Sequence, residues 1–228
     1  TGTDGDYYFG LETAFVSCSG VVRTWNGSAW SPSGTPDTLD QAIIAGNYNT
    51  VDDGDLDVCQ LTVDSGATLT VGAGDYLRTE SNIVVNGTLQ VDHQGSVVQV
   101  DPSATVLNNG TINVDVTTPV LQTRDFMVMG SPMDSETRGG VFTDAFLVLS
   151  HDPDSFNPED HPNIPQGATN FLDEEGDFWS GHSGGITVGE GYIVRPQSGY
   201  MDPANTTYDM TYAQGTLNNG TVARPMVY

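Results

Sequence analysis

The chain has 228 residues, of which 30 are Asp or Glu and six are Arg, while Lys is absent, so that the formal net charge is −24. Phosphate groups repel such an acidic chain, which argues against nucleic acid and anionic membrane surfaces as partners and favours solubility or cation binding. No apolar run approaches the roughly 20 residues that a membrane-spanning helix needs. Helix-forming residues are sparse, whereas Thr, Val, Gly, Asn and Asp abound, and this composition predicts an all-β fold.

We expect residues 1–39 to form an N-terminal cap or linking segment. Its main feature is a pair of tryptophans, Trp25 and Trp30, on either side of an Asn-Gly pair, a spacing that predicts a β-hairpin. Exposed tryptophan pairs can stack on sugar rings, which makes both residues candidates for ligand binding. A solenoid also needs a cap over its open end, and we favour this structural interpretation of the pair.

Residues 40–117 carry an internal repeat. Gly66, Gly87 and Gly110 are spaced 21 and 23 residues apart, and each is followed within three residues by an apolar–polar–apolar triplet. A period in the twenties, built from short alternating strands and Gly or Asn corners, is typical of a β-solenoid. Side chains alternate faces along a strand, so the first and third residues of each triplet point inward. We therefore predict a short parallel β-helix of about three rungs.

Two acidic clusters interrupt the chain, one beside Gly54 and one in a polar loop of the C-terminal half. Carboxylate oxygens are ligands that Ca²⁺ prefers, although the first cluster lacks the glutamate at the twelfth position of an EF-hand. A solvated acidic corner explains the same residues, so both interpretations stay open and no cofactor is required. The candidate calcium ligands are Asp52, Asp53, Asp55, Asp57, Asp173 and Asp177.

The pattern changes near residue 118. Pro119 follows the last triplet, and proline removes a donor from a strand ladder, which suits a domain junction. Continuous apolar runs at 126–129 and 145–149 fit strands that are covered on both faces. A long polar loop, residues 150–183, follows and carries Trp179, a speculative ligand-binding residue. We predict that residues 118–228 form a jelly-roll-like β-sandwich.

Several motifs occur in a characteristic order: Trp25-Asn26-Gly27, then residues 42–48, 61–71, 130–133, 189–196 and 215–220. Together they resemble the non-catalytic β-solenoid plus β-sandwich region of large, adhesin-like surface proteins that Bacteroidetes-type bacteria export by type IX secretion. The match covers roughly residues 24–228. The resemblance implies an extracellular or bacterial cell-surface location, a place within a longer chain, and no catalytic residues.

Two further features concern covalent chemistry. Cys18 and Cys59 are too few for a zinc site, which leaves two buried thiols or one disulfide. The other features indicate an exported protein, so we favour the disulfide. Thr38 lies in Asp37-Thr38-Leu39, which resembles the Asp-Thr-aliphatic O-glycosylation site of the same bacterial group.

A possible catalytic motif occurs at residues 181–185, where Gly-His-Ser-Gly-Gly fits the Gly-x-Ser-x-Gly pattern of a nucleophile elbow. That motif needs a strand before it and a helix after it, whereas a polar loop precedes this copy and a strand-like segment follows. The four histidines also lack metal-ligand spacing. We therefore expect no enzyme.

Instead, we expect a non-catalytic structural or display module of an extracellular adhesin or fibre. Its partners would be neighbouring domains or subunits of the same surface assembly, and glycans are a further candidate. The alternative is a carbohydrate-binding accessory module of a secreted polysaccharide-degrading enzyme, which a glycan array would separate from the first hypothesis.

Overall fold

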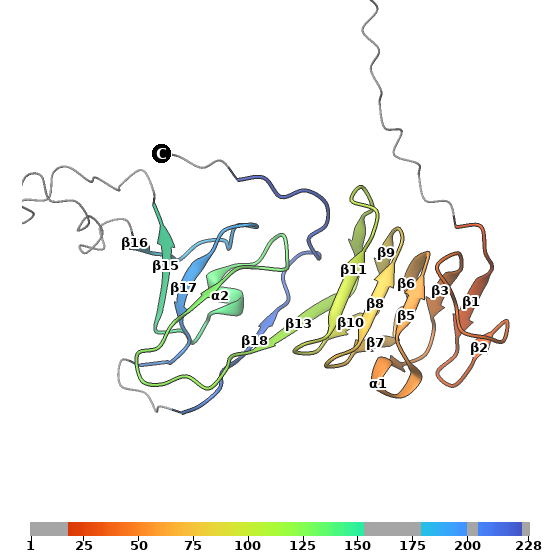
Figure 1. Cartoon of the computed structure of the whole chain (residues 1–228), viewed down its shortest axis with the longest axis horizontal. Helices are drawn as coiled ribbons and strands as arrows, with labels where there is room; N and C mark the ends of the chain where they lie inside the picture. Colours follow the sequence, from red (N-terminus) through yellow and green to blue (C-terminus); the bar gives the residue numbers. More distant parts are fainter. Residues whose placement is uncertain (1–17, 153–178, 200–204, 225–228) are drawn as a thin grey trace, which may run out of the picture.

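The fold is all-β: short strands stack along one axis in the N-terminal half, and a smaller sheet follows in the C-terminal half (Figure 1). The computed structural model describes residues 18–152, 179–199 and 205–224. Asp173 and Asp177, which belong to the second acidic cluster, lie outside the described residues.

Three sheets line the three faces of the stack. The first sheet has the strand order β12-β9-β6-β3-β1-β2, the second β18-β13-β10-β7-β4 and the third β11-β8-β5. Neighbouring strands are parallel except in the pairs β1–β2 and β13–β18. The strands are β1 (Val22–Trp25), β2 (Trp30–Ser31), β3 (Gln41–Ile44), β4 (Tyr48–Asn49), β5 (Leu56–Val58), β6 (Gln60–Val63), β7 (Thr68–Val71), β8 (Tyr76–Thr79), β9 (Ile83–Val85), β10 (Thr88–Val91), β11 (Ser96–Gln99), β12 (Val106–Asn108), β13 (Thr111–Thr117) and β18 (Asp209–Tyr212).

Equivalent residues of successive turns lie side by side. Leu69, Leu89 and Ile112 are register partners along the second sheet, and each has an exposed fraction of 0%. The residues between the inward positions point outward, because strand side chains alternate. One turn cannot bury its own apolar residues, so each turn depends on its neighbours for burial. This arrangement confirms the β-solenoid-like stack that the repeat predicts.

Glycine is required at the corners for two different reasons. Gly66 has a φ of +85°, a left-handed conformation that glycine adopts without steric cost. At Gly87 the reason is space: a Cβ atom there would lie 2.3 Å from the carbonyl oxygens of Asp64 and Ala67. The turns of the solenoid therefore approach each other too closely at this corner for any other residue.

The stack begins before residue 40, because β1 pairs in parallel with β3 and places Trp25 beside Ile44. The tryptophan segment is thus part of the stack as well as its cap. Within the described residues, five parallel strands lie in the first sheet, four in the second and three in the third. The expected number of about three rungs therefore describes only the third face.

A single helical turn, α1 (Thr50–Asp53), lies between β4 and β5. The side chain of Asn49 accepts a hydrogen bond from the backbone N–H of Val51, at 3.1 Å, and thereby caps the N-terminus of the turn. Gly54 ends the turn with a φ of +96°. The first acidic cluster consequently belongs to a compact corner of the stack.

The C-terminal half contains one four-stranded antiparallel sheet with the order β14-β17-β15-β16. Its elements are β14 (Met127–Met129), α2 (Arg138–Val141), β15 (Leu147–His151), β16 (Trp179–Gly181) and β17 (Tyr192–Arg195). The last strand, β18, does not join this sheet but pairs with β13 at the end of the solenoid's second sheet. A second sheet facing the four-stranded one is not among the described residues, so the jelly-roll-like sandwich stays a prediction.

One hydrophobic core runs through both halves, from Trp25 at the start of the stack to Tyr212 in β18. At the junction, Phe142 packs edge-on against Tyr212, with ring centroids 6.1 Å apart. Because the halves share buried side chains and the β13–β18 ladder, we expect them to unfold together rather than as independent domains.

Candidate functional site

An aromatic cluster closes the N-terminal end of the stack. The ring centroid of Trp25 lies 5.5 Å from that of Trp30 and 5.1 Å from that of Tyr48. Trp25 is 7% exposed, and its Nε1–H donates to the carbonyl oxygen of Asn47 at 2.8 Å. A ring held in this way has no free face for a sugar, so the contacts of Trp25 support the cap interpretation. Trp30 is half-buried on the same cluster.

Tyr48 anchors this end of the stack to the acidic corner. Its hydroxyl donates to the carbonyl oxygens of Asp53 and Gly54, at 3.0 Å and 2.9 Å. Burial, together with the negative charges of Asp53 and Asp55, raises the pKa of Tyr48 to about 12. The folded state therefore favours the protonated phenol.

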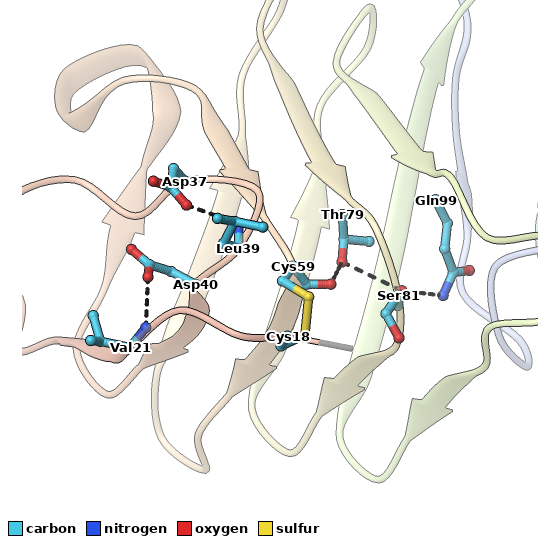
Figure 2. The surroundings of a disulfide bond; sticks show 9 residues. All are labelled: Cys18, Val21, Asp37, Leu39, Asp40, Cys59, Thr79, Ser81 and Gln99. Carbon is cyan, nitrogen blue, oxygen red and sulfur yellow. Dashed lines mark hydrogen bonds between the residues drawn. A yellow bond between two sulfur atoms is a disulfide. The ribbon is translucent and has the colours of Figure 1, made fainter. Parts of the chain in front are cut away.

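Cys18 and Cys59 form a disulfide with a sequence separation of 41 (Figure 2). Cys59 lies at a corner of the stack, between the equivalent corner residues of the turns before and after it. Its N–H donates to the carbonyl oxygen of Asp40, and its own carbonyl oxygen accepts from the N–H of Ser81, both at 2.8 Å. The disulfide thus fastens the incoming chain to the interior of the stack, two turns beyond the point where β1 begins.

A partly buried ion pair stabilises the same corner. The carboxylate of Asp40, whose side chain is 6% exposed, accepts from the guanidinium of Arg23 and from the N–H of Val21. The hydrogen bond from Arg23 is the main cause that holds the pKa of Asp40 below its usual value, with smaller contributions from the Val21 N–H and the charge of Arg23, against the opposing effect of burial. Nothing in the sequence marks this pair, because its members lie 17 residues apart and meet only when two turns stack.

The carboxylates of the first acidic cluster are engaged separately. Asp55 accepts from the N–H of Tyr76 at 2.8 Å, Asp57 accepts from the Tyr76 hydroxyl at 2.8 Å, and Asp53 accepts from a backbone N–H in front of α1. Asp52 is exposed on α1. Among the described residues, His, Cys, Asp and Glu form no group of three or more that could hold a metal ion. A calcium site at this corner stays a prediction.

The remaining candidates lie apart from one another. Thr38 is half-buried in a turn just before β3. Trp179 begins β16, and its ring lies 4.9 Å from that of His151. The Gly-x-Ser-x-Gly motif follows at the end of β16, and His182 contacts the ring of Tyr192 at 4.7 Å. The expected polar loop before the motif is wrong in part, because a strand, β16, runs directly into it. The described residues that follow the motif, up to 199, contain no helix, so the helix of a nucleophile elbow is missing among them.

The C-terminal half contributes a buried carboxylate that the sequence does not single out. Glu136 is 1% exposed and accepts hydrogen bonds from the backbone N–H groups of Thr137, Ala213 and Gln214, at 3.0, 2.9 and 3.2 Å. Burial and the charge of Glu136 raise the pKa of Tyr212. With its charge compensated by three N–H groups, Glu136 joins the start of α2 to the end of β18 and has the surroundings of a structural residue.

A cavity of about 410 Å³ lies where the solenoid meets the C-terminal half. Its walls are largely apolar, with Val97 and Val106 from the last turn of the stack and Pro132 and Leu217 from the other side. The side chain of Gln99 also faces it. This cavity is the strongest candidate for a binding site outside the cap.

Of the two polar atoms in the Gln99 side chain, only the nitrogen is hydrogen-bonded to residues that the structure describes. Its Nε2 donates to the carbonyl oxygens of Ser81 and Thr105, at 2.8 Å and 3.2 Å, and Figure 2 shows the first of these bonds. Its Oε1 is buried and has no partner in the part of the chain that the structure describes. A buried acceptor without a donor is costly, so Gln99 is an unusual residue in the wall of this cavity.

The comparisons with known proteins give one match. The family model described as "Domain of unknown function (DUF8693)" covers residues 19–228. No curated protein and no solved structure matches the chain. In the described part of the chain, no helix has the length and apolar character to cross a membrane. Since the family model spans nearly the whole chain, from the first turn of the solenoid to the C-terminal residues, the chain belongs to the DUF8693 family.

Proposed function

We propose that this chain is a non-catalytic structural and display module of an extracellular surface adhesin or fibre. The observation that carries the proposal is the single core from Trp25 to Tyr212, which lies between parallel strand ladders and is closed at one end by an aromatic cap. Such a unit resists local unfolding, because each turn buries the apolar residues of its neighbours. The jelly-roll form of the C-terminal half, and a count of about three complete rungs as set by the third sheet, remain part of this proposal.

The cross-links of the module favour a load-bearing role. The disulfide and the Arg23–Asp40 pair both tie the first turns of the stack together, and β18 pairs with β13 at the other end. Residues far apart in sequence are therefore joined at both ends of the solenoid. Force applied along the chain passes from Cys18 through the disulfide to Cys59, so residues 19–58 carry no load while the disulfide is intact. At the other end, the β13–β18 ladder must break before the inner turns can separate.

The surface charge supports an extracellular, solvated location. A net charge of −24 without any lysine keeps copies of the module apart and opposes nonspecific association with other acidic molecules. The sequence resemblance to type IX-secreted surface proteins points in the same direction. Adhesion itself would reside in exposed loops or in neighbouring domains of the assembly.

A deletion experiment tests the proposal. Removing residues 19–228 from the parent protein should shorten or weaken the surface structure and leave secreted hydrolase activity unchanged. The purified chain should neither turn over polysaccharides nor bind glycans on an array. Saturable glycan binding that is lost in Trp30→Ala but retained in Ser28→Ala would favour the carbohydrate-binding alternative. Turnover that a single carboxylate substitution abolishes would overturn the proposal.

A further inference from the structure

The solenoid ends in two strand edges. β11 is the last strand of the third sheet and β12 is the last strand of the first, whereas β18 covers the last parallel strand of the second sheet. An edge strand carries N–H and C=O groups that can pair with a further strand. Among the described residues, the end of the stack is therefore closed on one face and open on two.

The register identifies the open groups of β11. The N–H of Ser96 donates to Asp75 and the N–H of Val100 donates to Thr79, at 3.0 Å and 2.9 Å, so both face β8. Backbone groups alternate sides along a strand, and consequently the N–H and C=O groups of Val97 and Gln99 face away from β8. The open edge therefore presents two donors and two acceptors at the spacing of a parallel ladder.

The side chains of the same two residues point toward the cavity. Val97 is the register partner of Leu77 and Gln99 is the register partner of Thr79, and both of these β8 residues are completely buried. The next strand of the stack would place an apolar side chain over Val97 and a polar one over Gln99. That polar side chain would lie beside Gln99, whose Oε1 is buried and has no partner in the described residues.

We propose that the open edge of β11 accepts an extended segment of another polypeptide as one further parallel strand. The segment carries an aliphatic side chain that enters the cavity beside Val97 and, two residues later, a polar side chain beside Gln99. Main-chain pairing supplies affinity in this mode of recognition, and the alternate side chains supply specificity. Because the chain carries a net charge of −24, a neutral or basic segment is favoured over an acidic one.

This inference deepens the proposed function by naming the chemistry of a partner in the surface assembly. It rests on the proposed function only for the source of the strand, which would be a neighbouring subunit or domain. The open edge, the cavity and the unpaired Gln99 oxygen are independent of that role. Failure of strand binding would leave the deletion experiment unaffected.

The probe is a blocked peptide, Gly-Tyr-Leu-Arg-Thr-Gly, which repeats residues 76–79 of β8, the strand that already pairs with β11. We would titrate it into the isotope-labelled full chain and follow backbone amide resonances. Saturable shifts should appear first at the amides of Val97 and Gln99. No saturable binding, or binding that shifts amides only in other parts of the chain, would overturn the proposal.

Backbone methylation of the peptide provides a matched pair of controls. In the parallel register, the amide nitrogens of the peptide Tyr and Arg face β11, while those of Leu and Thr face away. Methylating the first pair should weaken binding at least about tenfold, because each lost hydrogen bond is worth about 1 kcal/mol. Methylating the second pair should change the affinity much less. Equal losses in the two peptides would exclude strand pairing.

A variant of the protein tests the edge from the other side. Gln99→Pro removes the open N–H and the side-chain amide, and proline is tolerated on an edge strand where the N–H faces outward. This variant should lose binding at least about tenfold, while Ser96→Ala, a change of an exposed side chain in the same strand, should retain it. Unchanged binding by Gln99→Pro would contradict the proposal. The methylated peptides decide the question if Gln99→Pro does not fold.

Discussion

The disulfide between Cys18 and Cys59 offers the most quantitative prediction for stability. The perturbation is its reduction, which breaks the S–S bond, adds one hydrogen to each sulfur and leaves the amino-acid sequence unchanged. The bond closes a segment with a sequence separation of 41. In the chain-entropy treatment, a loop of this length lowers the entropy of the unfolded state by an amount worth about 4 kcal/mol at 25 °C. We therefore expect reduction to lower the free energy of unfolding by about 4 kcal/mol.

The assay is urea unfolding of the oxidised and reduced chain, followed by circular dichroism. The double variant Cys18→Ala, Cys59→Ala in oxidising buffer serves as a control, because it lacks the cross-link irrespective of the redox conditions. The reduced chain should also have a larger m-value, since its unfolded state is less restricted and exposes more surface. A loss below about 1 kcal/mol would refute the reasoning, because the loop entropy would then be offset within the folded stack.

Three further predictions concern the interior of the stack. Asp40→Asn should lower the free energy of unfolding by about 1.5–3 kcal/mol at pH 7, because it removes a charge-assisted hydrogen bond. The difference from wild type should vanish as the pH falls through the lowered pKa of Asp40, because the wild-type carboxyl group then also becomes neutral. In wild type, the free energy of unfolding should decline once the pH rises above 10, because Tyr48 ionises there in the unfolded state while its pKa in the folded state is about 12. Tyr48→Phe should show a smaller decline in unfolding experiments at different pH values. An equal slope of unfolding free energy against pH in the two proteins would contradict the assignment. Leu89→Ala should cost about 2–5 kcal/mol in thermal or chemical unfolding, whereas Thr88→Ala on the outer face should cost at most about 0.5 kcal/mol, and similar values for the two would argue against the inward register.

The solenoid-like stack was accessible from sequence because its signal is local and repeated. The alternation of apolar and polar residues in each triplet, such as residues 69–71, predicts which side chains point inward and which point outward. The recurring glycines predict where the chain turns. The same logic fails for α1, a single turn of four residues that is too short to show a helical period. It also fails for the end of the stack, where β18 reaches β13 from almost 100 residues later.

Candidate site residues were less predictable, because their roles depend on direction and on partners from other turns. Asp53, Asp55 and Asp57 are close in sequence, yet each carboxylate meets a different donor. Trp25 is of a residue type that often stacks on sugars, but here it is buried against Trp30 and Tyr48. That burial depends on how β1 and β2 fold over Tyr48. Sequence spacing cannot supply these relations.

The edge of β11 was equally hidden from sequence. Residues 96–99 share no identical position with residues 76–79 of the preceding turn, but both have an inward apolar residue followed two positions later by an inward polar one. Only the topology reveals that no described strand follows them in the third sheet. The buried oxygen of Gln99 becomes notable for the same reason, since Thr79 at the equivalent position donates its hydroxyl proton to backbone carbonyls. A large polar residue at a position that the repeat predicts to point inward, such as Gln99, could have indicated the end of the stack from sequence.

Force spectroscopy tests the load-bearing role most directly. The chain would be pulled from its two ends in a fusion with a small helical reference domain. We predict one cooperative unfolding event at a higher force than the reference, and reduction of the disulfide should lengthen the released chain by about 15 nm, from a separation of 41 residues at about 3.6 Å each. Stepwise unravelling at forces below those that unfold the reference would contradict the account.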